Sequence, residues 1–430
     1  MQPTSIPETI PFRTLDPLKG AHKAILGVLV LIGVIAVVLA PTHPDRLWQA
    51  LLFNWLYFSS IAMGMVMVAV ALHLTNAKWA WSIRRFPLGG VAFLPISFLI
   101  LPIILLGGKE HLFHHWLHVE GDGVIEAKQA WLNFPGMFTR DIVALIVLFG
   151  LALAFAYFSL RPDMHDVGEE RHRGLYARMT SGWRGQHEEV ARSRHMLNRI
   201  GVVLGISYAV LWGIIAIDLA MSLAPHWFST MFPVAFFMGG FHAGIAFTAI
   251  AVTVMRRHLS LESLITRNQY HDLGKLVFAF AVFWMYLQWS QYVVIWYGLL
   301  PVEQEWVARR FTGLFAPLVR AAVFLVFVIP FFGLLTRPPK KTPAILAFFA
   351  GLILVGHWIE RYLLVVPSLW EGDTLPLGFT EIGIGLGFLG LFLAAYLTYL
   401  SRVPLLPSKA SLAVAETHPV PVHTTAPQTL

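Results

Sequence analysis

Seven ionisable side chains lie within stretches that are otherwise apolar, and they are the residues best placed to do chemistry. They are Asp141, Asp218, His242, Arg320, His357, Glu360 and Glu381. A charged side chain at the centre of a bilayer costs about 3 kcal/mol or more, so such residues usually bind a ligand, move protons or pair with one another. Each of the seven is therefore a candidate functional residue.

His357 and Glu360 are three residues apart, so a helix places them on one face, with Arg361 next to them. With the helix directions inferred below, most of the seven residues lie in the outer half of the membrane. Such a set could form a proton path to the outside. It could also form a pocket for a quinone headgroup, whose two oxygens need a donor and an acceptor. Alternatively, Arg320 pairs with Asp218 or Glu360 and the network only fixes helix packing.

The stretch 270–306 predicts the helix around which these residues are arranged. It carries no charge from Leu276 to Pro301, which is long enough to cross a hydrocarbon core of about 30 Å. Gln288, Ser290 and Gln291 lie inside it and need partners within the protein, because hydrocarbon offers none. Its second half is rich in Trp and Tyr, which is typical of an interfacial belt.

Composition indicates a multi-pass membrane protein. The chain has 430 residues, of which 57% are hydrophobic and 13% charged, about half the charged fraction of a soluble domain. We expect an all-α integral membrane fold of about ten spans, with spans 2–5 and 6–9 forming two like-oriented four-helix bundles and the first and last helices peripheral. The predicted spans are 22–40, 51–74, 87–107, 141–160, 200–223, 229–255, 275–300, 315–335, 343–366 and 378–401.

Lys and Arg concentrate in the N-terminus, the even-numbered loops and the tail, which predicts that both termini are cytoplasmic. The net charge of +7 therefore follows membrane topology, and we expect no nucleic-acid partner. The organisation is then a cytoplasmic N-terminus (1–21), a membrane domain (22–401) and a disordered cytoplasmic tail (402–430). The arginine-rich loop 161–199 is interpreted as a solvated hairpin or docking surface. At the cytoplasmic end of span two, His73 and residues 76–79 are interpreted as an interfacial anchor.

The chain has no cysteine, which excludes thiolate-held iron–sulfur clusters and covalently attached c-type haem within it. His242 and His357 could instead hold a b-type haem, since two histidines at similar depth on neighbouring helices are the usual ligands. The segment EHLFHHWLH (110–118) has spacings that could bind zinc, but it is interpreted as an amphipathic surface helix with Trp116 and Leu117 facing lipid. A secondary transporter built from like-oriented repeats is a further alternative.

Three segments resemble one known family. HDLGKLVFAFAVFWMYLQWSQYVVIWYG followed by LPVEQEW (271–306), NWLYFSSIAMG…LHLTNAKWAWSIRR (54–85) and KQAWLNFPGMFTRD (128–141) resemble the NrfD-type (polysulfide-reductase-type) membrane subunits. They are most similar to the second such subunit of bacterial alternative complex III, a quinol:electron acceptor oxidoreductase. The resemblance covers most of spans two to seven and is more diffuse beyond them.

The resemblance implies a ten-helix subunit of the bacterial inner membrane with two four-helix bundles. It implies as partners a homologous NrfD-type subunit, an extracytoplasmic iron–sulfur subunit related to molybdopterin enzymes, and multi-haem c-type cytochromes, with all iron–sulfur clusters and haems in those partners. We therefore expect a subunit that is not catalytic alone and that contributes a quinone (or menaquinone) pocket or a proton-conducting path. The seven site residues come from the membrane-depth argument and not from the family.

Overall fold

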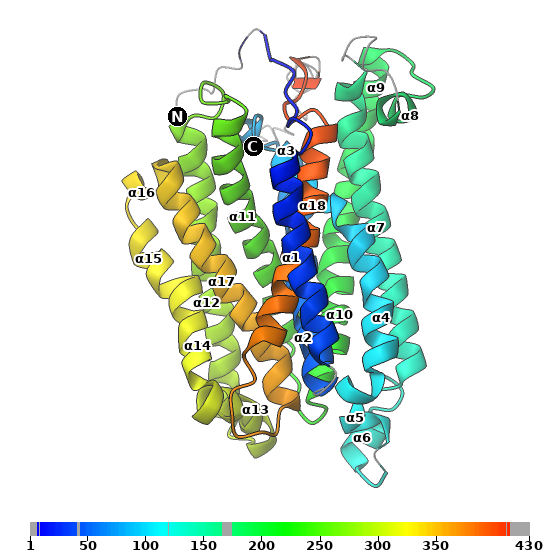
Figure 1. The fold of residues 1–430 in the computed structure, drawn as a ribbon, viewed down its shortest axis with the longest axis vertical. Helices are drawn as coiled ribbons and strands as arrows, with labels where there is room; N and C mark the ends of the chain where they lie inside the picture. The colour runs from blue at the N-terminus through cyan, green and yellow to red at the C-terminus, as the bar shows by residue number, and fades with distance from the viewer. Residues whose placement is uncertain are drawn as a thin grey trace, which may run out of the picture.

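The structure, a computed structural model, describes residues 7, 9–40, 44–118, 120–165, 174–409 and 411–412. Within these ranges the chain is helical and has no β-strand, and ten helices are long and apolar enough to cross a membrane (Figure 1). Each of the ten coincides with one predicted span. The all-α, ten-span membrane fold is therefore confirmed.

The first five crossings are α1 (Gly20–Leu39), α2 (Pro44–Leu74), α3 with α4 (Arg85–Leu88 and Leu94–Leu112), α7 (Phe134–Met164) and α9 with α10 (Gln186–Ser207 and Gly213–Leu219). The second five are α11 (Phe232–His258), α12 (Arg267–Gly298), α14 with α15 (Ala316–Val323 and Ile329–Leu334), α17 (Pro343–Leu369) and α18 (Phe379–Arg402). Short helices connect them: α5 (His114–Leu117), α6 (Gly123–Ala127), α8 (Leu175–Met179), α13 (Pro301–Phe311) and α16 (Arg337–Lys341).

The bundle has two ends, which are named here from the chain. The proximal end is the one at which α1 begins and α18 ends, and α8 and α16 lie there (Figure 1). The distal end carries α5, α6 and α13 (Figure 1). Because the number of crossings is even, the start of α1 and the end of α18 lie at the same end of the bundle.

Eight of the crossings form two groups of four, and α2 and α11, one from each group, pack against each other at the centre. α2 contacts α4 and α9, and α7 packs along α9, while α11 contacts α12 and α17, and α17 contacts α14. α1 packs mainly along α18, at the side of both groups (Figure 1). The two groups join where α2 meets α11, and glycine makes this contact possible, because a Cβ atom on Gly64 would overlap the Gly240 carbonyl.

Two of the crossings are interrupted by a π-helical turn, a feature that often marks functional sites. One turn, η5 (Tyr208–Trp212), joins α9 to α10, and the other, η8 (Phe324–Val328), joins α14 to α15. α17 passes close to η8 at Gly356, where an added Cβ would meet Val326. This close approach fixes the part of α17 that carries His357.

Two expectations need correction. The predicted disordered tail starts too early, because Leu405 and Leu406 are buried and the Leu405 amide donates to the Arg13 carbonyl at 3.0 Å. The rest of that prediction, from residue 413 on, lies outside the described residues. Trp116 is buried against Phe113 rather than facing lipid. The 161–199 loop is interpreted from its sequence as a solvated hairpin or docking surface; α7 ends at Met164 and α9 begins at Gln186, and residues 166–173 lie outside the described residues.

Candidate functional site

A buried relay of three titratable side chains lies where α11, α12 and α17 meet. His242 on α11 and His357 on α17 share a hydrogen bond of 3.0 Å between His242 Nδ1 and His357 Nε2. The other ring nitrogen of His357, Nδ1, is 2.7 Å from Glu360 Oε2 on the same helix. His242, His357 and Glu360 are 0%, 1% and 7% exposed, so the relay is shielded from lipid and water. As expected, His357 and Glu360 lie on one face of α17, next to His242.

Helix α12 supplies the remaining hydrogen-bond partners of Glu360. Its other carboxylate oxygen, Oε1, accepts hydrogen bonds from Trp284 Nε1 and from Gln288 Nε2, both at 2.8 Å. The buried amide of Gln288 thus has its partner inside the protein, as the sequence requires. Both oxygens of Glu360 therefore have hydrogen-bond partners, Trp284 and Gln288 at Oε1 and His357 at Oε2. Ser290 differs, because it bonds only to the Tyr286 carbonyl of its own helix.

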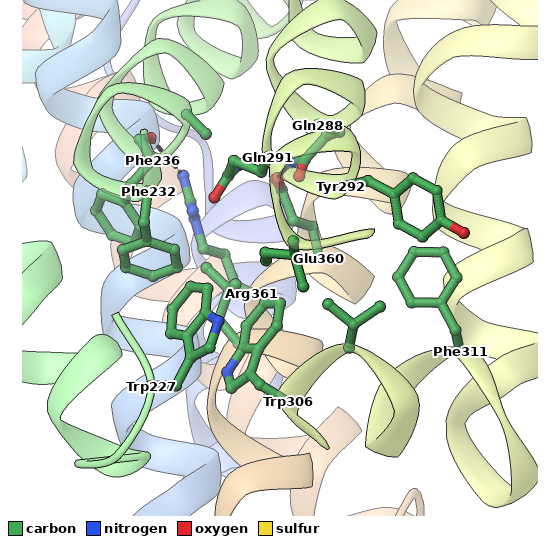
Figure 2. A pocket seen from close by; sticks show the side chains of 14 residues that line it. Trp227, Phe232, Phe236, Gln288, Gln291, Tyr292, Trp306, Phe311, Glu360 and Arg361 are labelled. Carbon is green, nitrogen blue, oxygen red and sulfur yellow. Dashed lines mark hydrogen bonds between the residues drawn. The ribbon is translucent and has the colours of Figure 1, made fainter. Parts of the chain in front are cut away.

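A cavity of about 80 Å³ lies against Glu360 on its distal side (Figure 2). Arg361 also lines it, with its guanidinium stacked 3.8 Å from the Phe236 ring and Nη2 donating to the Phe236 carbonyl at 2.9 Å. Arg361 Nη1 and Trp227 Nε1 are buried without a hydrogen-bond partner among the described residues. Gln288 and Gln291 supply further polar groups at the wall (Figure 2). The wall of the cavity is mostly apolar, but these few polar groups could hydrogen-bond to water.

A stacked tryptophan pair closes this cavity toward the distal end. The rings of Trp227 and Trp306 lie 4.0 Å apart at an interplanar angle of 6° (Figure 2). Beyond them is a second cavity of about 210 Å³, which the same two tryptophans also line. Arg310 on α13 lines this second cavity with Glu305, and burial together with the neighbouring Arg309 lowers the pKa of Arg310 well below its ordinary value.

Two further predicted residues, Asp141 on α7 and Asp218 on α10, form a separate buried cluster. Arg140 binds Asp218 through two hydrogen bonds, from Nε to Oδ2 at 2.7 Å and from Nη2 to Oδ1 at 2.8 Å. Trp131 Nε1 also donates to Asp218 Oδ1, at 2.8 Å, and its ring stacks under Arg140. The carboxyl of Asp141 is 0% exposed, and neither of its oxygens forms a hydrogen bond with a described residue. No hydrogen bond or ion pair between described residues joins this cluster to the relay.

The last two predicted residues lie away from both clusters. Glu381 accepts two hydrogen bonds from Arg46, at 2.9 and 2.8 Å, and a third from the Gly378 amide at the start of α18. This ion pair ties α2 to α18 and caps the helix. Arg320 is exposed in the last turn of α14 and forms no ion pair within the described chain. The expected pairing of Arg320 with Asp218 or Glu360 is therefore wrong, since Arg140 takes the first and His357 the second.

The geometry bears on both metal alternatives. An iron between two imidazoles, with metal–nitrogen bonds of about 2 Å, needs the nitrogens about 4 Å apart, whereas the bonded pair here is separated by 3.0 Å. The two histidines in this arrangement do not fit a haem between them. In the 110–118 segment the histidines bond to different partners, His111 to Asp45 and His118 to Glu110. Over the described ranges no three His, Asp or Glu side chains gather as metal ligands.

Sequence reasoning missed Arg140, Trp131 and Arg46, and it missed the stacked pair Trp227–Trp306. Arg140 directly precedes Asp141 in the sequence, but this does not indicate that Arg140 binds Asp218. No known protein-family profile matches this sequence, and no curated protein matches it. The function is therefore argued from the geometry above and from the resemblance in the three segments.

Proposed function

We propose that this chain is an integral membrane subunit of a quinol-oxidising respiratory complex of the alternative complex III type, in which it conducts protons. The observation that carries the proton path is the hydrogen-bonded series His242–His357–Glu360, buried in the membrane domain and ending at a cavity that Arg361, Gln288 and Gln291 also line. The resemblance of three long segments to NrfD-type subunits supports the assembly. The two arguments are independent.

The relay can transfer a proton stepwise with ordinary histidine chemistry. A protonated His242 passes its Nδ1 proton to Nε2 of His357, and His357 then releases its Nδ1 proton to Oε2 of Glu360. Each bond is within the distance needed for direct transfer, 3.0 and 2.7 Å. Glu360 then passes the proton to water in the adjoining cavity.

The size of the cavity supports a proton path more than a quinone pocket. Ligand pockets usually measure about 300–1,000 Å³, whereas a water molecule needs about 10–15 Å³. A volume of about 80 Å³ matches about five waters and is smaller than the usual ligand pocket. Arg361 and Trp227 supply buried donors that such water would satisfy. Water and protons are the occupants that this volume favours.

The distal direction of the path follows from the second cavity. The stacked pair Trp227–Trp306 stands between the cavity at Glu360 and the larger one lined by Glu305 and Arg310. Rotation of either indole would join the two cavities into one wet route. The distribution of Lys and Arg supports a cytoplasmic proximal end, and we propose that this route opens toward the periplasm of a bacterial inner membrane.

The proposed partners are a homologous NrfD-type subunit, an extracytoplasmic iron–sulfur/molybdopterin-like subunit and multi-haem c-type cytochromes. The test is a gentle detergent purification of the tagged chain from its native membranes, followed by mass spectrometry and an optical spectrum of the eluate. Co-purification of those partners with haem absorbance supports the assembly. A chain that elutes alone, colourless and stable contradicts it, and transport of a solute by that chain in liposomes would identify a secondary transporter.

A further inference from the structure

A third cavity lies at the proximal end of the bundle, and none of the relay residues lines it. It measures about 220 Å³ and is lined by the end of α2, the segment that follows it, α7 and α9. Its lining includes basic side chains and other hydrogen-bond donors, but no Asp or Glu. These donors are Lys78, Trp81, Arg84, Arg85, Ser193 and Arg194.

Four buried donor atoms at this cavity have no acceptor. Trp81 Nε1, Arg84 Nε, Arg85 Nε and Ser193 Oγ form no hydrogen bond within the described parts of the chain. Trp81, Arg85 and Ser193 are only 4%, 1% and 2% exposed, so bulk water does not replace the missing partners. Leaving a buried polar group unsatisfied costs about 1–3 kcal/mol each. Four such donors around one cavity indicate a ligand that only accepts.

The charge balance gives the sign of that ligand. Arg85 also binds Ser159 and forms an ion pair with Asp163. The other oxygen of Asp163 is occupied by Ser408 and Ser411. Among the described residues, Asp163 is thus committed to Arg85 and the serines, and neither Lys78 nor Arg84 forms an ion pair.

The rest of the wall is apolar and belongs to membrane-crossing helices. Leu74 is exposed at the end of α2, and Phe158 on α7 and Leu197 on α9 line the same cavity. A basic pocket between helices, at the level where the crossings end, has the form that binds phosphate-bearing headgroups. Tryptophan, serine and arginine N–H and O–H groups together suit phosphate oxygens, which accept several charge-assisted hydrogen bonds.

We propose that this cavity binds a phosphate group, through Arg84, Trp81 and Ser193 with Lys78 at the rim. The group belongs either to an anionic phospholipid, whose chains would follow the apolar wall, or to free phosphate. Lys78 belongs to residues 76–79, which were expected to form an interfacial anchor, and in this proposal it contacts the phosphate group. The proposal does not depend on the proton path, because it uses none of the relay residues.

The experiment uses the purified, delipidated full-length chain in detergent, titrated with dioleoylphosphatidylglycerol in one arm and inorganic phosphate in the other. Binding is followed by native mass spectrometry for the lipid and by thermal stabilisation for both. We expect Arg84→Gln to weaken binding about tenfold, the effect of losing one charge-assisted hydrogen bond. Tighter binding of the lipid assigns the phosphate to a headgroup, and equal or tighter binding of inorganic phosphate assigns it to a soluble anion.

Two variants keep the test decisive. Lys78→Gln removes an exposed rim charge without disturbing the core, so it reports on the site even if Arg84→Gln folds poorly. Arg257→Gln removes an exposed arginine at the same end, outside the cavity, and should bind like wild type. The proposal is overturned if wild type binds neither probe, or if the Lys78 and Arg84 variants bind as tightly as Arg257→Gln.

Discussion

Replacing Glu360 by Gln separates a relay function from a structural one. The amide oxygen of Gln can still accept from Trp284 and Gln288, and its NH2 can donate to Nδ1 of His357 if that ring changes tautomer. Only the charge is lost, so charge-assisted hydrogen bonds become neutral ones, at a cost of about 1 kcal/mol. The amide cannot take up a proton, and proton transfer through the site should fall about 100-fold.

The assay pairs thermal unfolding of the full chain with infrared difference spectra recorded after a pH jump. Wild type should show a carboxyl band that Glu360→Gln lacks, while the melting temperatures remain close. Glu381→Gln is the matched control, because Glu381 is a buried carboxylate held by Arg46. It should keep the band but lose about 2 kcal/mol or more of stability, since it leaves Arg46 without its partner. An unchanged band in Glu360→Gln would refute the relay.

Three further predictions follow from the packing and the charges. Gly64→Ala should destabilise the α2–α11 contact by about 2 kcal/mol or more, whereas Gly27→Ala, which meets no atom, should be neutral in the same melting assay. Arg140→Gln should cost about 3–5 kcal/mol, and adding Asp218→Asn should recover at least about 1 kcal/mol; a purely additive double mutant would contradict the pairing. Burial and the neighbouring His114 lower the pKa of His115, so its stabilising contribution is complete above the ordinary histidine pKa and is lost as pH falls below that value through the lowered pKa of the folded state. The melting temperature should therefore fall less between pH 8 and pH 5.5, a range chosen to span the usual pKa of about 6.5, in His115→Gln than in wild type; equal falls would contradict the shift.

The membrane spans were predictable because hydrophobic length is a one-dimensional property of the sequence. The pairing of His357 with Glu360 was predictable for the same reason, since three residues on a helix define one face. The need of Gln288 for a partner followed from the absence of acceptors in lipid. Each of these inferences uses only local spacing or the solvent.

The remaining partners could not be predicted, because they depend on how helices rotate against one another. Arg140 on α7 binds Asp218 on α10, and neither sequence segment indicates how these two helices are oriented relative to each other. Arg320 was misjudged because a long side chain near a helix end can extend toward the interface and needs no buried carboxylate. The stacked Trp227–Trp306 pair joins a loop to α13, a contact that hydropathy does not encode.

In the proposed function, protons reach the distal side through Glu360 during quinol oxidation. This is tested by measuring proton release by vesicles that contain the complex purified through the tagged chain, with quinol supplied and external pH recorded. We expect Glu360→Gln to lose most turnover-linked proton release while the complex remains assembled, and Glu381→Gln to retain it. Unchanged proton release and turnover in an intact Glu360→Gln complex would show that protons do not pass through Glu360.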